Sequence, residues 1–206
     1  MSSLNLLTHG AAKPAAHALC ALPLGWLVFA AVSNQLGANP AEALIRSLGD
    51  WTLRGLLLTL AITPLRVKFQ LPALLRLRRL IGVWTFAYAC LHLLAYAWLD
   101  MGLDLGEIAR DIAKRPFILV GMLSLALLLP LAATSFNAAV RALGGKRWQA
   151  LHRLVYLIPI TACLHFWWMR AGKQNFADPF FYSLLFAALL GWRLWRRLQP
   201  ALSAKR

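Results

Sequence analysis

Residues 80–99 read LIGVWTFAYACLHLLAYAWL, a run that contains one histidine, His92, and no Asp, Glu, Lys or Arg. A helix of about twenty residues rises about 30 Å, which matches the hydrocarbon thickness of a bilayer. The run lacks the alternation of polar and apolar residues that a strand of a transmembrane barrel requires. It therefore predicts a membrane-spanning helix.

The same pattern recurs along the whole chain. Of its 206 residues, 60% are hydrophobic and 14% are charged, whereas an average soluble protein is about half apolar and a quarter charged. We therefore expect one all-α integral membrane domain over residues 1–206, a six-transmembrane-helix bundle. The predicted spans are residues 14–33, 50–66, 80–99, 116–134, 148–169 and 179–196.

The distribution of charge predicts the orientation of these helices. The net charge of +15 is compatible with nucleic-acid binding, but the basic residues follow the positive-inside rule instead. With a cytoplasmic N-terminus, most of the 22 basic residues lie in cytoplasmic segments, and both termini are cytoplasmic. All seven acidic residues then lie in or next to outer segments: Glu42, Asp50, Asp100, Asp104, Glu107, Asp111 and Asp178.

The cysteines exclude several kinds of site. Cys20, Cys90 and Cys163 each lie within a predicted span, and the chain has no CxxC pair. An odd number of isolated cysteines indicates neither a disulfide framework nor a zinc site. The absence of CxxCH excludes covalent attachment of a c-type heme.

Two histidines lie at similar depth in parallel spans. His92 and His165 lie roughly 18 Å and 25 Å from the inner ends of the third and fifth helices. Two neutral imidazoles at one level can ligate a heme iron from both sides, which leaves no open position and suits electron transfer. The alternative is that each histidine only hydrogen-bonds to a neighbouring helix. Both interpretations remain open.

His152 predicts a second site near the inner face. It precedes His165 by thirteen residues, about 20 Å of helix, and Pro159 between them can kink the helix. Its candidate partner is His17, which lies near the same face in the first span. A water or another ligand at His152, with His17 an unpartnered interfacial histidine, is the alternative.

Two charged connections are candidate binding segments. Arg76, Arg78 and Arg79 can contact lipid headgroups, or they can hold heme propionates or a flavin phosphate. On the outer side, DMGLDLGEIARDIAKR at residues 100–115 is either a short surface helix that meets a partner or a connecting loop.

The stretches RRLIGVWTFAYACLH (78–92) and WQALHRLVYL (148–157), followed by His165, resemble the ferric-reductase-like transmembrane domain. Members of that family hold b-type hemes between histidines of two helices. Six spans without an appended flavin or nicotinamide domain resemble most closely the heme-binding membrane subunits of bacterial methionine sulfoxide reductase systems. The resemblance thus implies a heme b between the third and fifth helices.

The resemblance also implies a location, partners and a further cofactor. It implies an inner-membrane subunit that takes electrons from quinone, or from a cytoplasmic flavin reductase. The acceptor it implies is a periplasmic molybdopterin-dependent methionine sulfoxide reductase, MsrP. It implies FMN binding as well, although the sequence shows no FMN motif.

The sequence departs from the two-heme members of this family on the third helix. Those members carry a second histidine there, but the positions 13 and 14 residues before His92 are Arg79 and Arg78. Only one complete bis-histidine site is therefore expected. A stand-alone ferric reductase-type cytochrome b remains an alternative, as does a histidine-relay proton or ion transporter, which the lack of acids inside the spans disfavours.

Overall fold

The computed structural model describes residues 10–172 and 174–203. Every regular element in that part of the chain is a helix, and no strand occurs there. The all-α prediction is confirmed. The first two long helices are α2 (Ala12–Val32) and α3 (Pro40–Phe69).

Helix α3 begins well before the predicted start at residue 50. The Asn39 side chain accepts a hydrogen bond from the backbone N–H of Glu42, and Pro40 occupies the first turn. These are favourable residues for starting a helix. An ion pair between Arg46 and Glu42, one turn apart, further supports this polar extension.

The next segment is continuous and helical from residue 72 to residue 100. It consists of η1 (Pro72–Leu74), α4 (Leu75–Ala95) and the π-helical turn η2 (Tyr96–Asp100). Helices α3 and α4 form the most extensive helix pair of the described structure. They pack closely because Gly55 of α3 lies directly against the buried Thr85 of α4.

The connection that follows η2 contains a helix rather than an irregular loop. Helix α5 (Leu105–Lys114) is capped by Asp104, whose carboxylate accepts from the backbone N–H groups of Gly106 and Glu107. Helix α6 (Pro116–Ala133) follows, with its proline in the first turn.

The predicted span at 148–169 is helical but not one regular helix, because three consecutive helical pieces meet there. They are α7 (Asn137–His152), the 3₁₀ turn η3 (Arg153–Tyr156) and α8 (Ile158–Ala171). Pro159 has no backbone N–H to donate, so it fits the first turn of a new helix and interrupts a continuous one.

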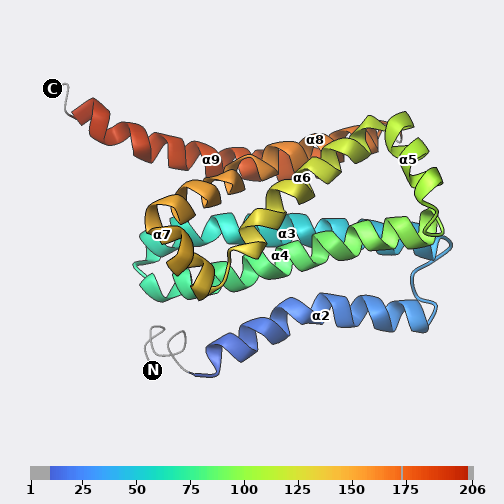
Figure 1. Cartoon of the computed structure of the whole chain (residues 1–206), viewed down its shortest axis with the longest axis horizontal. Coiled ribbons are helices and arrows are strands. Elements are labelled where there is room, and N and C mark those ends of the chain that lie inside the picture. Colours follow the sequence, from blue (N-terminus) through green and yellow to red (C-terminus); the bar gives the residue numbers. More distant parts are fainter. Residues whose placement is uncertain (1–9, 173, 204–206) are drawn as a thin grey trace.

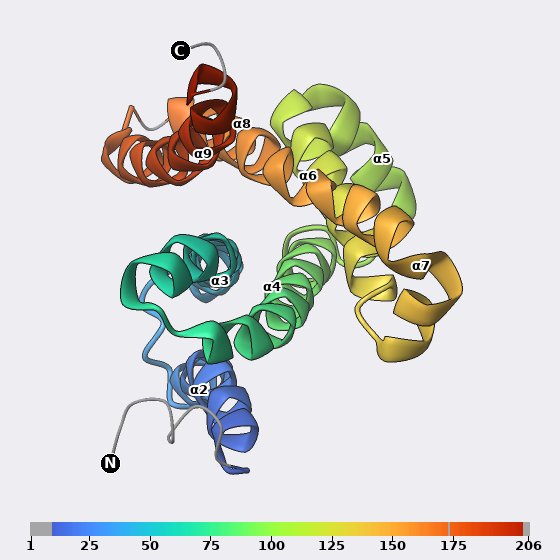
Figure 2. The ribbon, with the colours of Figure 1, turned by 90° about the vertical axis from the view of Figure 1, so that its left-hand side faces the viewer.

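The last helix, α9 (Ala177–Ser203), returns along α8 and α3. The start of α2 and the end of α9 lie at the same end of the bundle as α7, whereas α5 lies at the opposite end (Figure 1). Viewed from the α7 end, α3 and α4 lie side by side, with α2 on one side of them and α6, α8 and α9 on the other (Figure 2).

Four helical stretches of the described residues are long and apolar enough to cross a membrane. They are Ala12–Val32, Pro72–Asp100, Pro116–Ala133 and Asn137–Ala171. Large apolar side chains are also exposed on the outside of the bundle; Leu19, Trp26 and Val32 of α2 are each more than half exposed. Such a surface suits lipid rather than water, and the chain is a membrane protein.

Candidate functional site

The imidazole rings of His92 on α4 and His165 on α8 face one another. Their centroids are 6.3 Å apart and their planes are nearly perpendicular, at 83°. Both side chains are partly buried within the bundle. The structure thus brings together the two histidines that the sequence placed at one depth.

A backbone carbonyl group of another helix holds each ring, on α3 for His92 and on α6 for His165. His92 Nδ1 lies 2.8 Å from the carbonyl oxygen of Ile45 on α3, and His165 Nδ1 lies 2.6 Å from that of Phe117 on α6. A carbonyl oxygen can only accept, so both Nδ1 atoms donate and carry the proton. Each neutral ring therefore has an unprotonated Nε2, the form that ligates a metal.

Two glycines allow this close approach. A Cβ added at Gly121 on α6 would lie 2.8 Å from His165 Nδ1, and one at Gly49 on α3 would lie 3.2 Å from His92 Cε1. Any larger residue would push the rings away from their carbonyl partners. Gly49 and Gly121 are therefore part of the site, together with the backbone of Ile45 and Phe117.

The spacing of the rings fits one metal ion between them. A metal–imidazole bond is about 2.0–2.1 Å long, and the centre of an imidazole lies about 1 Å behind its ligating nitrogen. Two such ligands whose Nε2 atoms point at one ion from opposite sides have a ring separation of roughly 6 Å, and the 6.3 Å between His92 and His165 matches this distance. Two axial imidazoles are also the protein ligands that a six-coordinate heme iron needs.

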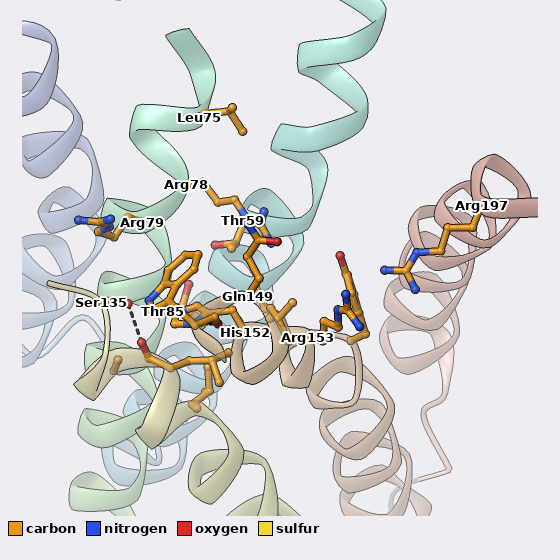
Figure 3. A pocket seen from close by; sticks show the side chains of 18 residues that line it. Thr59, Leu75, Arg78, Arg79, Thr85, Ser135, Gln149, His152, Arg153 and Arg197 are labelled. Atoms are coloured by element: carbon orange, nitrogen blue, oxygen red, sulfur yellow. Dashed lines mark hydrogen bonds between the residues drawn. The ribbon is translucent and has the colours of Figure 1, made fainter. Parts of the chain in front are cut away.

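A second feature is a cavity of about 530 Å³ around His152, near the end of α7 (Figure 3). The His152 ring stacks on Trp148, with centroids 3.8 Å apart, and its Nδ1 lies 3.1 Å from the Trp148 carbonyl oxygen. Its Nε2 is buried and has no hydrogen-bond partner among the described residues. Polar or charged side chains in the lining include Arg78, Arg79, Gln149, His152, Arg153 and Arg197.

The remaining predicted site residues lie apart from this cavity or have other partners. His17 is exposed and accepts a hydrogen bond of 3.0 Å from Trp84 Nε1. The described lining of the cavity includes neither His17 nor Arg76, which is also exposed. Arg79 borders the cavity, but its guanidinium donates to Asn137 Oδ1 at 2.6 Å. The structure therefore brings His152 and Arg78 together, and it places His17 against Trp84.

Sequence reasoning missed the glycines and the two carbonyl groups. A glycine in an apolar span is a general signal for close helix packing. That signal points to a contact but does not identify the partner, so nothing in the sequence linked Gly49 to His92 or Gly121 to His165.

Comparison with known proteins places the chain in a family. The family model described as "Ferric reductase like transmembrane component" matches residues 48–163. This range includes His92 and His152 but stops just before His165.

Three similar curated proteins carry the same name, protein-methionine-sulfoxide reductase heme-binding subunit MsrQ. The protein from Polaromonas naphthalenivorans is 61% identical over 95% of this chain and 89% of its own length. Those from Herminiimonas arsenicoxydans and Caulobacter vibrioides are 52% and 46% identical, over 82% and 88% of this chain and 78% and 86% of their own lengths. No solved structure matches the chain. The chain therefore belongs to the ferric reductase like transmembrane component family, and within that family to the MsrQ proteins.

Proposed function

We propose that this protein is the heme-binding, electron-transferring membrane subunit of a protein-methionine-sulfoxide reductase system. The observation that carries the proposal is the 6.3 Å separation of the His92 and His165 rings, which suits axial ligation of one heme b. The names of its relatives, which are heme-binding subunits, point to the same cofactor.

The residues around the proposed heme determine which chemistry the heme can carry out. When bound, heme supplies one-electron redox chemistry. His92 and His165 would both ligate the iron, and an iron held in this way would carry electrons rather than bind oxygen or substrate. The carbonyl groups of Ile45 and Phe117 accept hydrogen bonds from the Nδ1 atoms of His92 and His165. These bonds orient the rings and make each Nε2 a stronger metal ligand. This arrangement favours electron transfer over ligand activation.

We propose that all six predicted ranges cross a bacterial inner membrane. Helices α3 and α9 then supply the second and sixth spans, although charged residues interrupt both. The basic α7 connection and both termini are cytoplasmic, and α5 is periplasmic. The positions of α2, α5, α7 and α9 in the bundle support this orientation (Figure 1).

Electrons then enter on the α7 side and leave on the α5 side. The cavity at His152 is a candidate for a second cofactor near the inner face, either a second heme or FMN, or for the headgroup of a quinol. The unpartnered Nε2 of His152, which can accept a hydrogen bond or bind a metal, and the guanidinium of Arg78 support a ligand there that combines a hydrogen-bond donor or a metal with negative charge. The proposed donor is the quinone pool or a cytoplasmic flavin reductase.

The proposed acceptor is the periplasmic molybdopterin enzyme MsrP, which reduces methionine sulfoxide in oxidised proteins. The purified protein in liposomes tests this route. A quinol, or a flavin reductase with its reduced nicotinamide, should reduce the heme, and added MsrP with methionine sulfoxide should then reoxidise it. A heme that every donor reduces but that MsrP fails to reoxidise would instead support a stand-alone ferric reductase-type cytochrome.

A further inference from the structure

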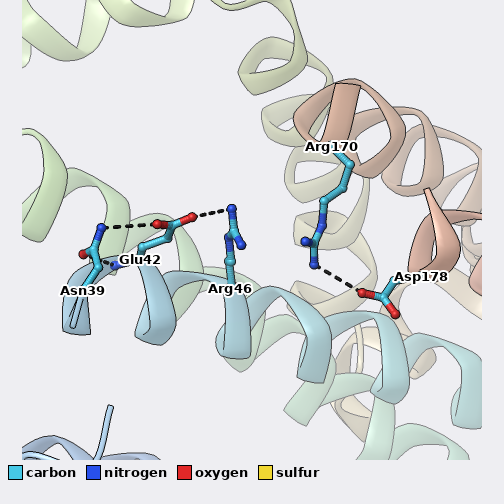
Figure 4. Close-up of polar contacts among 5 residues, drawn as sticks. All are labelled: Asn39, Glu42, Arg46, Arg170 and Asp178. Atoms are coloured by element: carbon cyan, nitrogen blue, oxygen red, sulfur yellow. Dashed lines mark hydrogen bonds and ion pairs between the residues drawn. The ribbon is translucent and has the colours of Figure 1, made fainter. Parts of the chain in front are cut away.

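Two arginines, Arg46 and Arg170, lie within electrostatic range of the same carboxylate, that of Asp50. Arg46 extends from α3 and contacts Glu42, and Arg170 extends from α8 and contacts Asp178 (Figure 4). Arg46 follows Ile45, whose carbonyl holds His92, and Arg170 lies beyond His165 toward the outer end of α8. Neither residue belongs to the cavity at His152.

The guanidinium of Arg170 is buried with few partners. Its side chain is 12% exposed, and one terminal nitrogen contacts Asp178, itself 59% exposed, at 3.3 Å. Its Cζ lies over the Phe166 ring at 5.4 Å, and its Nε is buried without a hydrogen-bond partner among the described residues. A guanidinium has five N–H donors, and removing them from water is costly unless an anion binds them. Arg170 thus has unused capacity for an anion.

Nearby acidic residues do not fill that capacity. Asp50 on α3 lies within electrostatic range of Arg46, Arg54 and Arg170, yet among the described residues it forms no ion pair with any of them. Arg54 is directed elsewhere, because its Cζ lies 4.6 Å from the Trp51 ring and its Nε donates to Tyr182 at 3.2 Å. Arg46 already pairs with Glu42 on its own helix, so a further anion would share Arg46 with that carboxylate, whereas Arg170 has only the contact with Asp178.

We propose that Arg46 and Arg170 bind the two propionate carboxylates of the heme held by His92 and His165. This inference rests on the proposed function. Protoheme carries both carboxylates on one edge, and the planar fork of an arginine matches a carboxylate with two parallel hydrogen bonds. The pair turns the propionate edge toward the outer surface. It thereby fixes the rotation of the porphyrin, which two axial imidazoles alone leave free.

Esterified heme tests this inference without any measurement of enzymatic activity. The full chain, purified without heme, is titrated with protoheme and with its dimethyl ester, which keeps the iron but has no carboxylate. The readout is the ratio of the two affinities, because comparing this ratio across variants cancels differences in how the porphyrins partition into detergent. The wild-type protein should bind protoheme roughly ten- to hundredfold more tightly than the ester, as expected for charge-assisted hydrogen bonds.

The same ratio is measured for Arg46→Gln and Arg170→Gln, where it should fall toward one. Arg170→Lys should restore part of it, since a lysine keeps the charge but not the fork. The control is Arg110→Gln, which removes an exposed arginine of α5 that pairs with Glu107 at 2.9 Å and should leave the ratio unchanged.

The outcomes separate this inference from the proposed function. Equal binding of both porphyrins by the wild-type protein, with low-spin bands, overturns the arginine assignment and leaves the heme function standing. The partition of each porphyrin into protein-free detergent micelles is measured separately and divided out of the wild-type ratio, so this comparison decides the question even where a substituted protein fails to fold. A full preference for protoheme in both glutamine variants also overturns the assignment. Failure of the wild-type protein to bind either porphyrin overturns the heme function, and the inference with it.

Discussion

The rings of His92 and His165 meet at 6.3 Å because each is held from behind by a carbonyl of another helix, Ile45 on α3 and Phe117 on α6. The pair thus depends on four helices rather than on α4 and α8 alone. Substitutions on α3 and α6 should therefore affect the proposed heme, although neither helix supplies a ligand to the iron.

Gly121→Ala should disturb the proposed heme site most strongly among the glycines of the bundle. The new Cβ would lie 2.8 Å from His165 Nδ1, and such overpacking costs about 1–3 kcal/mol. We expect weaker heme retention and a shifted midpoint potential, measured by redox titration. Gly49→Ala should have a smaller effect of the same kind, since its Cβ would lie 3.2 Å from His92.

The matched control for these two variants is Gly191→Ala on α9. A Cβ at that position has no atom within 4 Å among its described surroundings, so heme content and potential should stay at wild-type values. Equal behaviour of Gly121→Ala and Gly191→Ala would contradict the role assigned to the close approach at His165.

The order and type of the helices could be predicted because apolar runs of membrane length leave few alternatives. The start of α3 could not be predicted, because Glu42 and Arg46 make residues 40–49 appear polar. The Asn39 cap and the ion pair between Glu42 and Arg46 stabilise this part of the helix, and such local contacts do not follow from hydropathy. The first part of helix α7 lies outside the predicted spans for a similar reason, because it is polar and contains adjacent glycines, Gly144 and Gly145.

The candidate site was predictable only in part. Depth along a helix follows from residue number, and this placed His92 and His165 at one level. Contacts between helices do not follow from residue number, so the carbonyl partners were missed. The pairing of His17 with His152, one of two alternatives left open by the sequence, rested on shared depth alone, and the structure places His17 against Trp84.

The proposed topology predicts opposite labelling of two exposed lysine positions. Lys114 lies at the end of α5 and Lys146 lies in α7. In a background with all three native cysteines replaced by alanine, Lys114→Cys should react with a membrane-impermeant maleimide in intact spheroplasts. Lys146→Cys should react only after permeabilisation. Labelling of both positions in intact spheroplasts would be incompatible with a cytoplasmic α7.

His152→Ala should leave the low-spin spectrum of the outer heme intact and impair its reduction from the cytoplasmic side. The variant removes the buried, unpartnered Nε2 from the cavity. We expect the rate of heme reduction by quinol or flavin reductase to fall at least about tenfold, a loss seen even for outer-shell partners of metal sites. Stopped-flow spectroscopy measures this rate, with Arg76→Gln as the control outside the cavity lining. An unchanged rate would exclude His152 from the route.

Gly55→Ala should destabilise the contact between α3 and α4. Its Cβ would lie 2.5 Å from Thr85 Oγ1, which is buried and donates to the Ile81 carbonyl at 2.8 Å. The expected cost is about 1–3 kcal/mol, visible as a lower midpoint of thermal unfolding in detergent. Gly82→Ala is the control at the same interface, because its nearest neighbour would be 3.9 Å away. Adding Thr85→Ala to Gly55→Ala should recover part of the loss, and no recovery would argue against this clash.

Quantification of low-spin heme in the His92→Ala protein tests the central claim most directly. Electron paramagnetic resonance and the pyridine hemochrome assay should show loss of the bis-histidine signal in this variant and partial recovery when imidazole is added. His17→Ala, which removes an exposed histidine bonded to Trp84, should keep the signal in full. A complete low-spin bis-histidine signal in purified His92→Ala protein would contradict the assignment of His92 and His165 as the axial ligands.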